Sequence, residues 1–208
     1  MMKTSYDYWE NYYEKNREPA ESSNFAKFVL PFLRPDKLLI ELGCGNGKDC
    51  IYFSQNGISV LAIDQCSEEV DFLSEKFKDL KTLNFMAGDM TNLSNTPNPD
   101  YLYSRFTLHA IDLEGEKKVL KWAYENLKTG GIFFIEVRSV NDDLFGVGEA
   151  LPDNAFYSDH YRRFEVIDEL EQRLKDQGFN ILYKQEAKGL APFKDRDPSI
   201  IRILANKV

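Results

Sequence analysis

The chain has 208 residues, 43% of them hydrophobic, and a formal net charge of −8 at pH 7. This length suits one domain with a sizeable core, so we expect residues 1–208 to form a single domain. The acidic balance argues against nucleic-acid binding and favours a small-molecule partner. No apolar run approaches the ~20 residues of a membrane span, and the charged, aromatic N-terminus is unlike a signal peptide.

The cysteines Cys44, Cys50 and Cys66 are odd in number and form no Cys-x-x-Cys pair. This pattern argues against a disulfide framework or a zinc site. We therefore expect no bound metal, no membrane association and a cytoplasmic protein. The sequence gives no clear oligomer signal, so monomer and homodimer both stay open.

The N-terminal segment 1–20 is dense in aromatic residues, and Tyr6, Trp9 and Tyr13 recur at helical spacing. This spacing predicts a helix with one buried face. The face can either cover a ligand pocket or brace the sheet.

Strand-like and helix-like segments alternate along the rest of the chain, which predicts an α/β fold with a mainly parallel sheet. Strands are predicted at 38–42, 58–63, 83–86, 101–104 and 132–137, and helices at 49–56, 67–78, 114–127 and 164–177. Two late strands, 179–183 and 200–205, suit an antiparallel hairpin at the sheet edge. The one long irregular stretch is Ser139–Tyr161. Because loops of that length are commonly functional, we expect a substrate-side loop at 139–163.

A glycine-rich turn follows the first predicted strand, in the sequence LLIELGCGNGKD at Leu38–Asp49. Glycines let the backbone approach a ligand closely, because no Cβ stands in the way. A dinucleotide fingerprint needs a third glycine where Lys48 stands, and a P-loop needs Ser or Thr where Asp49 stands. Both nucleotide motifs are therefore disfavoured.

The segment ELGCGNG resembles motif I of the class I methyltransferases that use S-adenosyl-L-methionine (SAM). The resemblance implies a Rossmann-like fold with seven strands and helices on both faces, with SAM as cofactor and S-adenosyl-L-homocysteine as product. It also implies that the backbone at Gly43, Cys44 and Gly45 approaches the methionine part, with Glu41 near its ammonium.

The other cofactor contacts implied by the resemblance follow the next two strands. Asp64, with its neighbour Gln65, matches the acid that accepts hydrogen bonds from the ribose hydroxyls. Asp89 and Met90 match the turn that binds adenine. Cofactor contacts are also expected from Arg105 and from Trp9, whose ring could stabilise the sulfonium.

Several arginines and both histidines of this acidic chain lie in the segments that follow the fourth and fifth predicted strands. Arginine binds phosphate or carboxylate oxygens well, which predicts an anionic acceptor. Arg105, His109 and His160 are the catalytic candidates, the two histidines as general bases. The candidates for substrate binding are Arg105, His109, Arg138, Tyr161, Arg162 and Arg163. Each also has a structural interpretation: Arg105, for example, could simply pair with an acid.

We therefore predict a SAM-dependent methyltransferase that acts on a small, anionic metabolite or sugar precursor. An NAD(P)-dependent reductase and a non-catalytic SAM-binding protein are the alternatives. The segments YSRFTLHAI, EVRSV, HYRRF and GLAPF also resemble small bacterial methyltransferases linked to surface-polysaccharide decoration.

Overall fold

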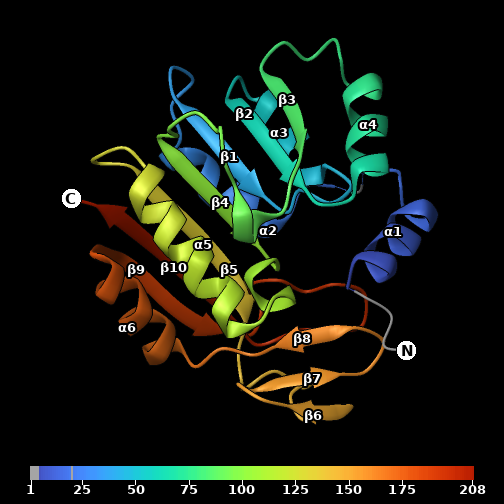
Figure 1. Cartoon of the computed structure of the whole chain (residues 1–208), viewed down its shortest axis with the longest axis vertical. Helices are drawn as coiled ribbons and strands as arrows, with labels where there is room; N and C mark the ends of the chain where they lie inside the picture. Colours follow the sequence, from blue (N-terminus) through green and yellow to red (C-terminus); the bar gives the residue numbers. More distant parts are fainter. Residues whose placement is uncertain (1–4, 20) are drawn as a thin grey trace.

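A seven-stranded sheet organises the molecule in this computed structural model, which describes residues 5–19 and 21–208, with side chains from Tyr8 onward (Figure 1). The strand order is β3-β2-β1-β4-β5-β10-β9. Strands β1 to β5 pair in parallel, whereas β10 is antiparallel to both β5 and β9. The strands are β1 Leu38–Leu42, β2 Ser59–Asp64, β3 Leu83–Ala87, β4 Tyr101–Arg105, β5 Ile132–Arg138, β9 Phe179–Ala187 and β10 Ile200–Lys207. The predicted sheet and its antiparallel hairpin are confirmed.

Helices lie on both faces of this sheet, as a parallel sheet with crossover connections requires (Figure 1). They are α1 Ser5–Lys15, α2 Asn24–Val29, α3 Lys48–Gln55, α4 Ser67–Lys76, α5 Leu113–Asn126 and α6 Ile167–Gln177, with 3-10 turns at Leu30–Phe32, Met90–Asn92 and Leu108–Ala110. Helix α2 was not predicted; Ser23 begins it by accepting a hydrogen bond from the Ala26 N–H at 2.9 Å. None of the described helices is long and apolar enough to cross a membrane.

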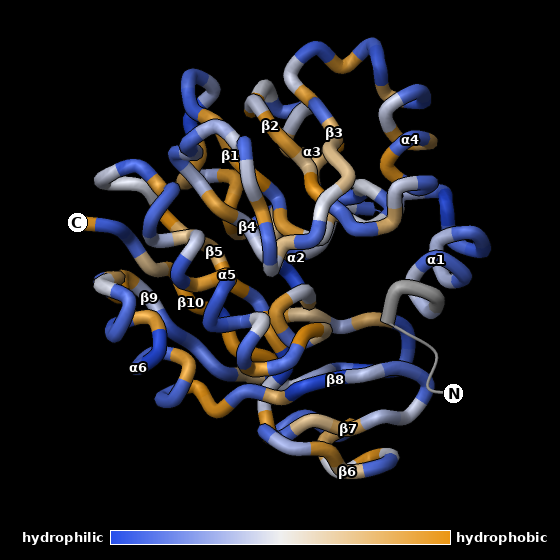
Figure 2. Tube along the Cα trace, viewed as in Figure 1, coloured by the Kyte–Doolittle hydropathy of each residue, from blue (hydrophilic) through white to orange (hydrophobic). Residues whose placement is uncertain are grey.

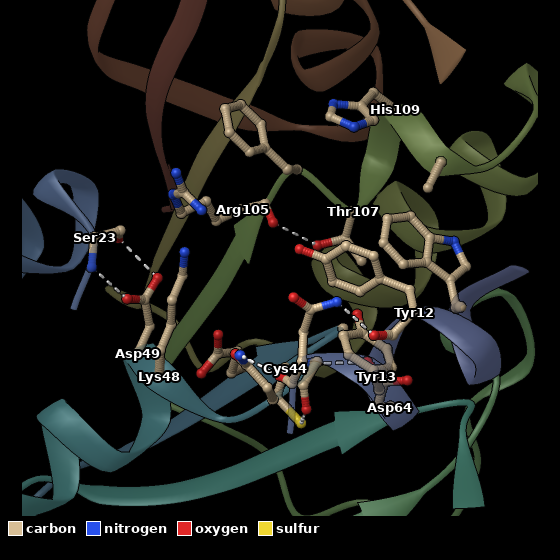
Figure 3. Close-up of a pocket in the computed structure, with 18 of the residues that line it drawn as sticks. Tyr12, Tyr13, Ser23, Cys44, Lys48, Asp49, Asp64, Arg105, Thr107 and His109 are labelled. Atoms are coloured by element: carbon tan, nitrogen blue, oxygen red, sulfur yellow. Dashed lines mark hydrogen bonds between the residues drawn. The ribbon is translucent and has the colours of Figure 1, made fainter. Parts of the chain in front are cut away.

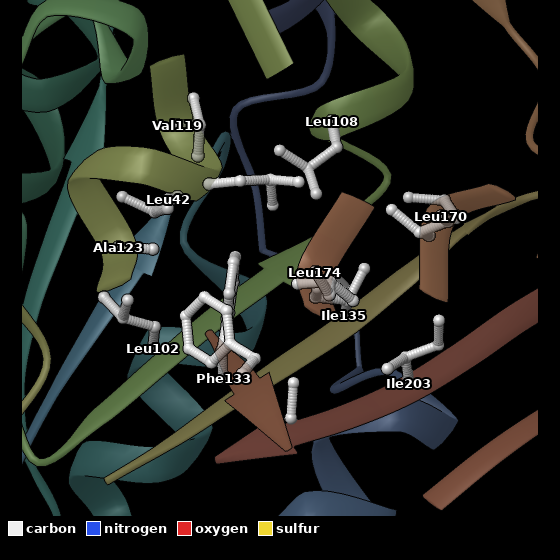
Figure 4. Packing of buried hydrophobic residues seen from close by; sticks show 14 of the residues in the cluster. Leu42, Leu102, Leu108, Val119, Ala123, Phe133, Ile135, Leu170, Leu174 and Ile203 are labelled. Carbon is white, nitrogen blue, oxygen red and sulfur yellow. The ribbon is translucent and has the colours of Figure 1, made fainter. Parts of the chain in front are cut away.

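The core consists of two hydrophobic layers, one on each face of the sheet. Adjacent residues of β5 show why: Phe133 packs in the layer under α5 and α6, whereas Phe134 packs in the layer under α2 and α3. Figure 4 shows the first layer around Leu102, Phe133 and Val119. Hydrophobic residues concentrate along the central strands, and α1 is largely hydrophilic (Figure 2).

The expectation of an irregular loop at 139–163 is wrong. This segment holds three short antiparallel strands, β6 Glu149–Leu151, β7 Ala155–Tyr157 and β8 Tyr161–Arg163. Phe156 anchors them by packing edge-on against Phe145 and Phe164, with ring centroids 5.1 and 6.0 Å away. Phe164 therefore packs with the three short strands, and α6 begins three residues later than predicted.

Candidate cofactor and acceptor site

A cavity of about 1150 Å³ opens where β1, β2, β4 and β5 end. Helix α1, the glycine-rich turn and the segment 191–198 complete its walls. The carboxyl ends of parallel strands are where α/β sheets bind their ligands, so this cavity is the candidate site.

The glycine-rich turn forms the floor of the cavity. Gly43, Gly45 and Gly47 all have positive φ, at 71°, 54° and 80°. A Cβ at Gly45 would lie 2.7 Å from the Tyr13 hydroxyl, inside the cavity. Other side chains at this position would therefore fill the space that a ligand needs.

Asp64 connects this turn to the end of β2 (Figure 3). Its carboxylate accepts hydrogen bonds from the Gly45 N–H at 2.8 Å and from the Cys66 N–H at 3.0 Å. Each oxygen thus holds one backbone donor and keeps capacity for a ligand hydroxyl. Cys44 and Gln65 also line the cavity.

Glu41 lies at the end of β1, buried in the cavity wall. Burial raises the pKa of its carboxyl well above the usual range. In the described part of the chain, its Oε2 has no hydrogen-bond partner. Because buried polar atoms are rarely left unpaired, Glu41 fits a ligand that donates hydrogen bonds, such as an ammonium.

Asp89 and Met90 line the cavity next to the end of β3. Asp89 uses Oδ1 to accept from the Thr91 N–H and hydroxyl, both at 2.8 Å, and so begins the short 3-10 turn. This arrangement fixes the orientation of the Asp89 carboxylate.

Aromatic residues of α1 form the wall opposite the strands. Trp9 stacks on Tyr13 with a centroid separation of 5.9 Å, and Tyr8 packs on His160 at 4.2 Å. The side chain of Tyr6, which we assigned to the same face, lies outside the described residues.

Three of the predicted arginines also line the cavity, each held by an acid. Arg105 Nε lies 2.9 Å from Glu136 Oε1, and Arg138 Nη1 lies 2.7 Å from Asp142 Oδ2. Arg162 pairs with an aspartate in the same way. A guanidinium has five N–H donors, so each arginine keeps donors for a ligand.

His109 and His160 also line the cavity. Burial and neighbouring arginines lower the pKa of His109 well below its usual range and that of His160 to about 4. Both rings are therefore neutral at pH 7. Among the described atoms, His109 Nδ1 has no hydrogen-bond partner.

The placement of Tyr161 and Arg163 in the acceptor site is wrong. Neither is among the described residues that line the cavity, and the Arg163 side chain is 2% exposed. It forms buried ion pairs with Glu116 and Glu165. The reason is strand alternation: Arg162 faces the cavity, so its neighbours on β8 face the other way.

Some cavity residues were missed by the sequence analysis. Phe106 has a φ of 57° and lies under two guanidiniums, with Arg105 4.4 Å and Arg138 5.3 Å from its ring centre. No sequence signal marked Phe106. Lys48 also lines the cavity and was missed, although it directly follows the last glycine of the motif. The other missed lining residues include Tyr8, Tyr12, Phe193 and Arg196.

Comparison with known proteins shows the family to which the chain belongs. The family model described as a methyltransferase domain matches residues 8–184. The Haemophilus influenzae protein named "Probable S-adenosyl-L-methionine-dependent methyltransferase TehB" is 24% identical over 140 residues, which are 66% of this chain and 47% of that protein. The chain thus spans about half the length of the curated relatives it matches first.

Solved structures share the fold. A SAM-dependent methyltransferase from Methanosarcina mazei has a TM-score of 0.75 at 18% identity, covering 87% of this chain and 97% of that one. The Burkholderia thailandensis 1,6-didemethyltoxoflavin-N1-methyltransferase, solved with S-adenosylhomocysteine, has a TM-score of 0.69 at 20% identity, covering 89% and 76%. Since the family model covers most of the sequence, the chain belongs to this methyltransferase-domain family.

Proposed function

We propose that this protein transfers the methyl group of SAM to a small acceptor that bears a phosphate or a carboxylate. The observation that carries the proposal is that Arg105, Arg138 and Arg162 line the same cavity as His109, whose neutral ring has no hydrogen-bond partner for Nδ1 among the described atoms. Arginine donors suit an anion, and a neutral imidazole can accept a proton.

The cofactor half of the proposal assigns roles to residues at or just after the ends of β1, β2 and β3. Glu41 would bind the ammonium of SAM, Asp64 the ribose hydroxyls and Asp89 the adenine amine. The orphan oxygen of Glu41 and the backbone hydrogen bonds that orient the Asp64 carboxylate support this assignment.

When bound, SAM supplies an electrophilic methyl group for an in-line displacement. The residues of the chain align the acceptor and exclude water, with the α1 aromatic wall closing the cavity. For a hydroxyl or amine acceptor, His109 would take the proton. An ionised oxygen acceptor needs no base, and the arginines would then bind its non-attacking oxygens.

A phosphorylated sugar precursor of a surface polysaccharide is the narrower form of the proposal. It is supported by the resemblance of four short segments and by the fit of a sugar phosphate to arginine donors.

Replacing Arg138 with glutamine is expected to raise the KM for the acceptor about 10- to 100-fold, because a charge-assisted contact is lost. Affinity for SAM should stay unchanged. The acceptor for this measurement comes from a screen of phosphorylated and carboxylated metabolites with methyl-labelled SAM.

The matched control is Arg34→Gln, which removes an arginine from an exposed pair with Asp36, outside the cavity. Both variants should bind SAM like the wild type. An unchanged KM in Arg138→Gln, or acceptors found only among uncharged compounds, would contradict the anionic-acceptor proposal.

A further inference from the structure

Lys48 is the first residue of α3, directly after the glycine-rich turn. Its side chain lines the cavity and extends toward the same part of it as Arg105 (Figure 3). Among the described residues, no carboxylate lies within 4.0 Å of its ammonium. By contrast, the guanidiniums of Arg105 and Arg138 each pair with a carboxylate. Burial and the charge of Arg105 lower the pKa of Lys48, while Asp49, Glu41 and Glu136 raise it.

Two of the three acids near Lys48, Asp49 and Glu136, already have other hydrogen-bond or ion-pair partners. Asp49 accepts hydrogen bonds from the Ser23 N–H at 2.7 Å, the Ser23 hydroxyl at 2.8 Å and the Tyr103 hydroxyl at 2.7 Å. Glu136 is shared between two arginines, with Arg202 Nε 2.8 Å from its Oε2. The partly buried Lys48 ammonium is thus left without an anion within 4.0 Å among the described residues, and a ligand that enters the cavity can supply one.

The third acid is Glu41, whose charge raises the pKa of Lys48. Among the described atoms, its Oε2 has no hydrogen-bond partner. The cavity wall therefore presents an unpaired cation and an unpaired acid close to one glycine-rich turn. An α-amino acid carries a carboxylate and an ammonium on one carbon, and so offers one charge to each.

We propose that Lys48, together with Arg105, binds the α-carboxylate of the amino-acid end of SAM, while Glu41 binds its ammonium. This inference rests on the proposed function. It adds Lys48 to the cofactor contacts, which the sequence analysis had assigned only to other residues. It places Arg105 at the boundary between cofactor and acceptor, and leaves Arg138 and Arg162 to the acceptor.

The test compares two ligands that differ only in the carboxylate: S-adenosylhomocysteine and its decarboxylated form, S-adenosyl-3-thiopropylamine. Calorimetry gives the Kd of each for the wild type and for Lys48→Met. We expect the substitution to weaken S-adenosylhomocysteine binding about 10- to 100-fold, as for a hydrogen bond to a charged group. Binding of the decarboxylated ligand should change by no more than about twofold.

Lys48→Arg, which keeps the charge, should retain most of the preference for the carboxylated ligand. Lys117→Met is the matched control, since Lys117 lies on the exposed side of α5 and pairs with Glu114. Equal losses for both ligands, or none, in Lys48→Met would overturn the inference. If the wild type binds neither ligand, the proposed function itself fails, which is a separate result.

Discussion

Replacing Arg163 with methionine is expected to lower the free energy of unfolding by about 3–5 kcal/mol, the usual cost of breaking a buried ion pair. Arg163 lies between Glu116 and Glu165. Among the described residues, its removal leaves these buried carboxylates with Arg173 as their one remaining cationic partner. Urea denaturation followed by circular dichroism measures the change.

The control for this prediction is Arg34→Met, because Arg34 forms an ion pair with Asp36 that is exposed on both sides. Surface pairs contribute about 0–1 kcal/mol, so this variant should unfold almost like the wild type. If Arg163→Met kept full stability but lost methyl transfer, Arg163 would belong to the acceptor site after all.

Replacing Gly45 with alanine is expected to weaken SAM binding about 5- to 150-fold, equivalent to the 1–3 kcal/mol cost of overpacking. The added Cβ would enter the cavity beside the Tyr13 hydroxyl, where we place the cofactor. Calorimetric titration with SAM measures the loss.

Gly57→Ala separates this effect from backbone strain. Gly57 also has a positive φ, of 82°, but a Cβ there would meet nothing within 4 Å. Both variants carry a similar backbone strain of about 1–2 kcal/mol. Only Gly45→Ala adds a contact inside the cavity, so only this variant should lose SAM affinity. Equal SAM affinity in the two variants would show that the glycine-rich turn does not cradle the cofactor.

The sequence predicted the sheet well because its strands are apolar and separated by helices of clear periodicity. It failed at 139–163 because strands of three residues are too short to show alternation. The packing of Phe156 against Phe145 and Phe164 stabilises them, and aromatic packing of this kind is not readable from spacing.

Arg162 and Arg163 show the same limit within the site. The two are adjacent and chemically identical, yet one faces the cavity and the other is buried. The burial partner Glu116 lies 47 residues away in sequence. Only the pairing of β8 determines which arginine faces which side.

Lys48 illustrates a different failure. The sequence analysis used it only as the residue that breaks a dinucleotide fingerprint. Its functional meaning depends on Arg105 at the end of β4, and on the engagement of Asp49 by Ser23 and Tyr103. The fold brings these residues together from three separate segments of the chain.

The most direct test of the account is calorimetric titration of the purified protein with SAM, S-adenosylhomocysteine and NADH. The account predicts that the first two bind with micromolar affinity and that NADH does not bind. Binding of NADH without SAM would contradict it, and Asp64 would then be the ribose ligand of a dinucleotide-dependent reductase.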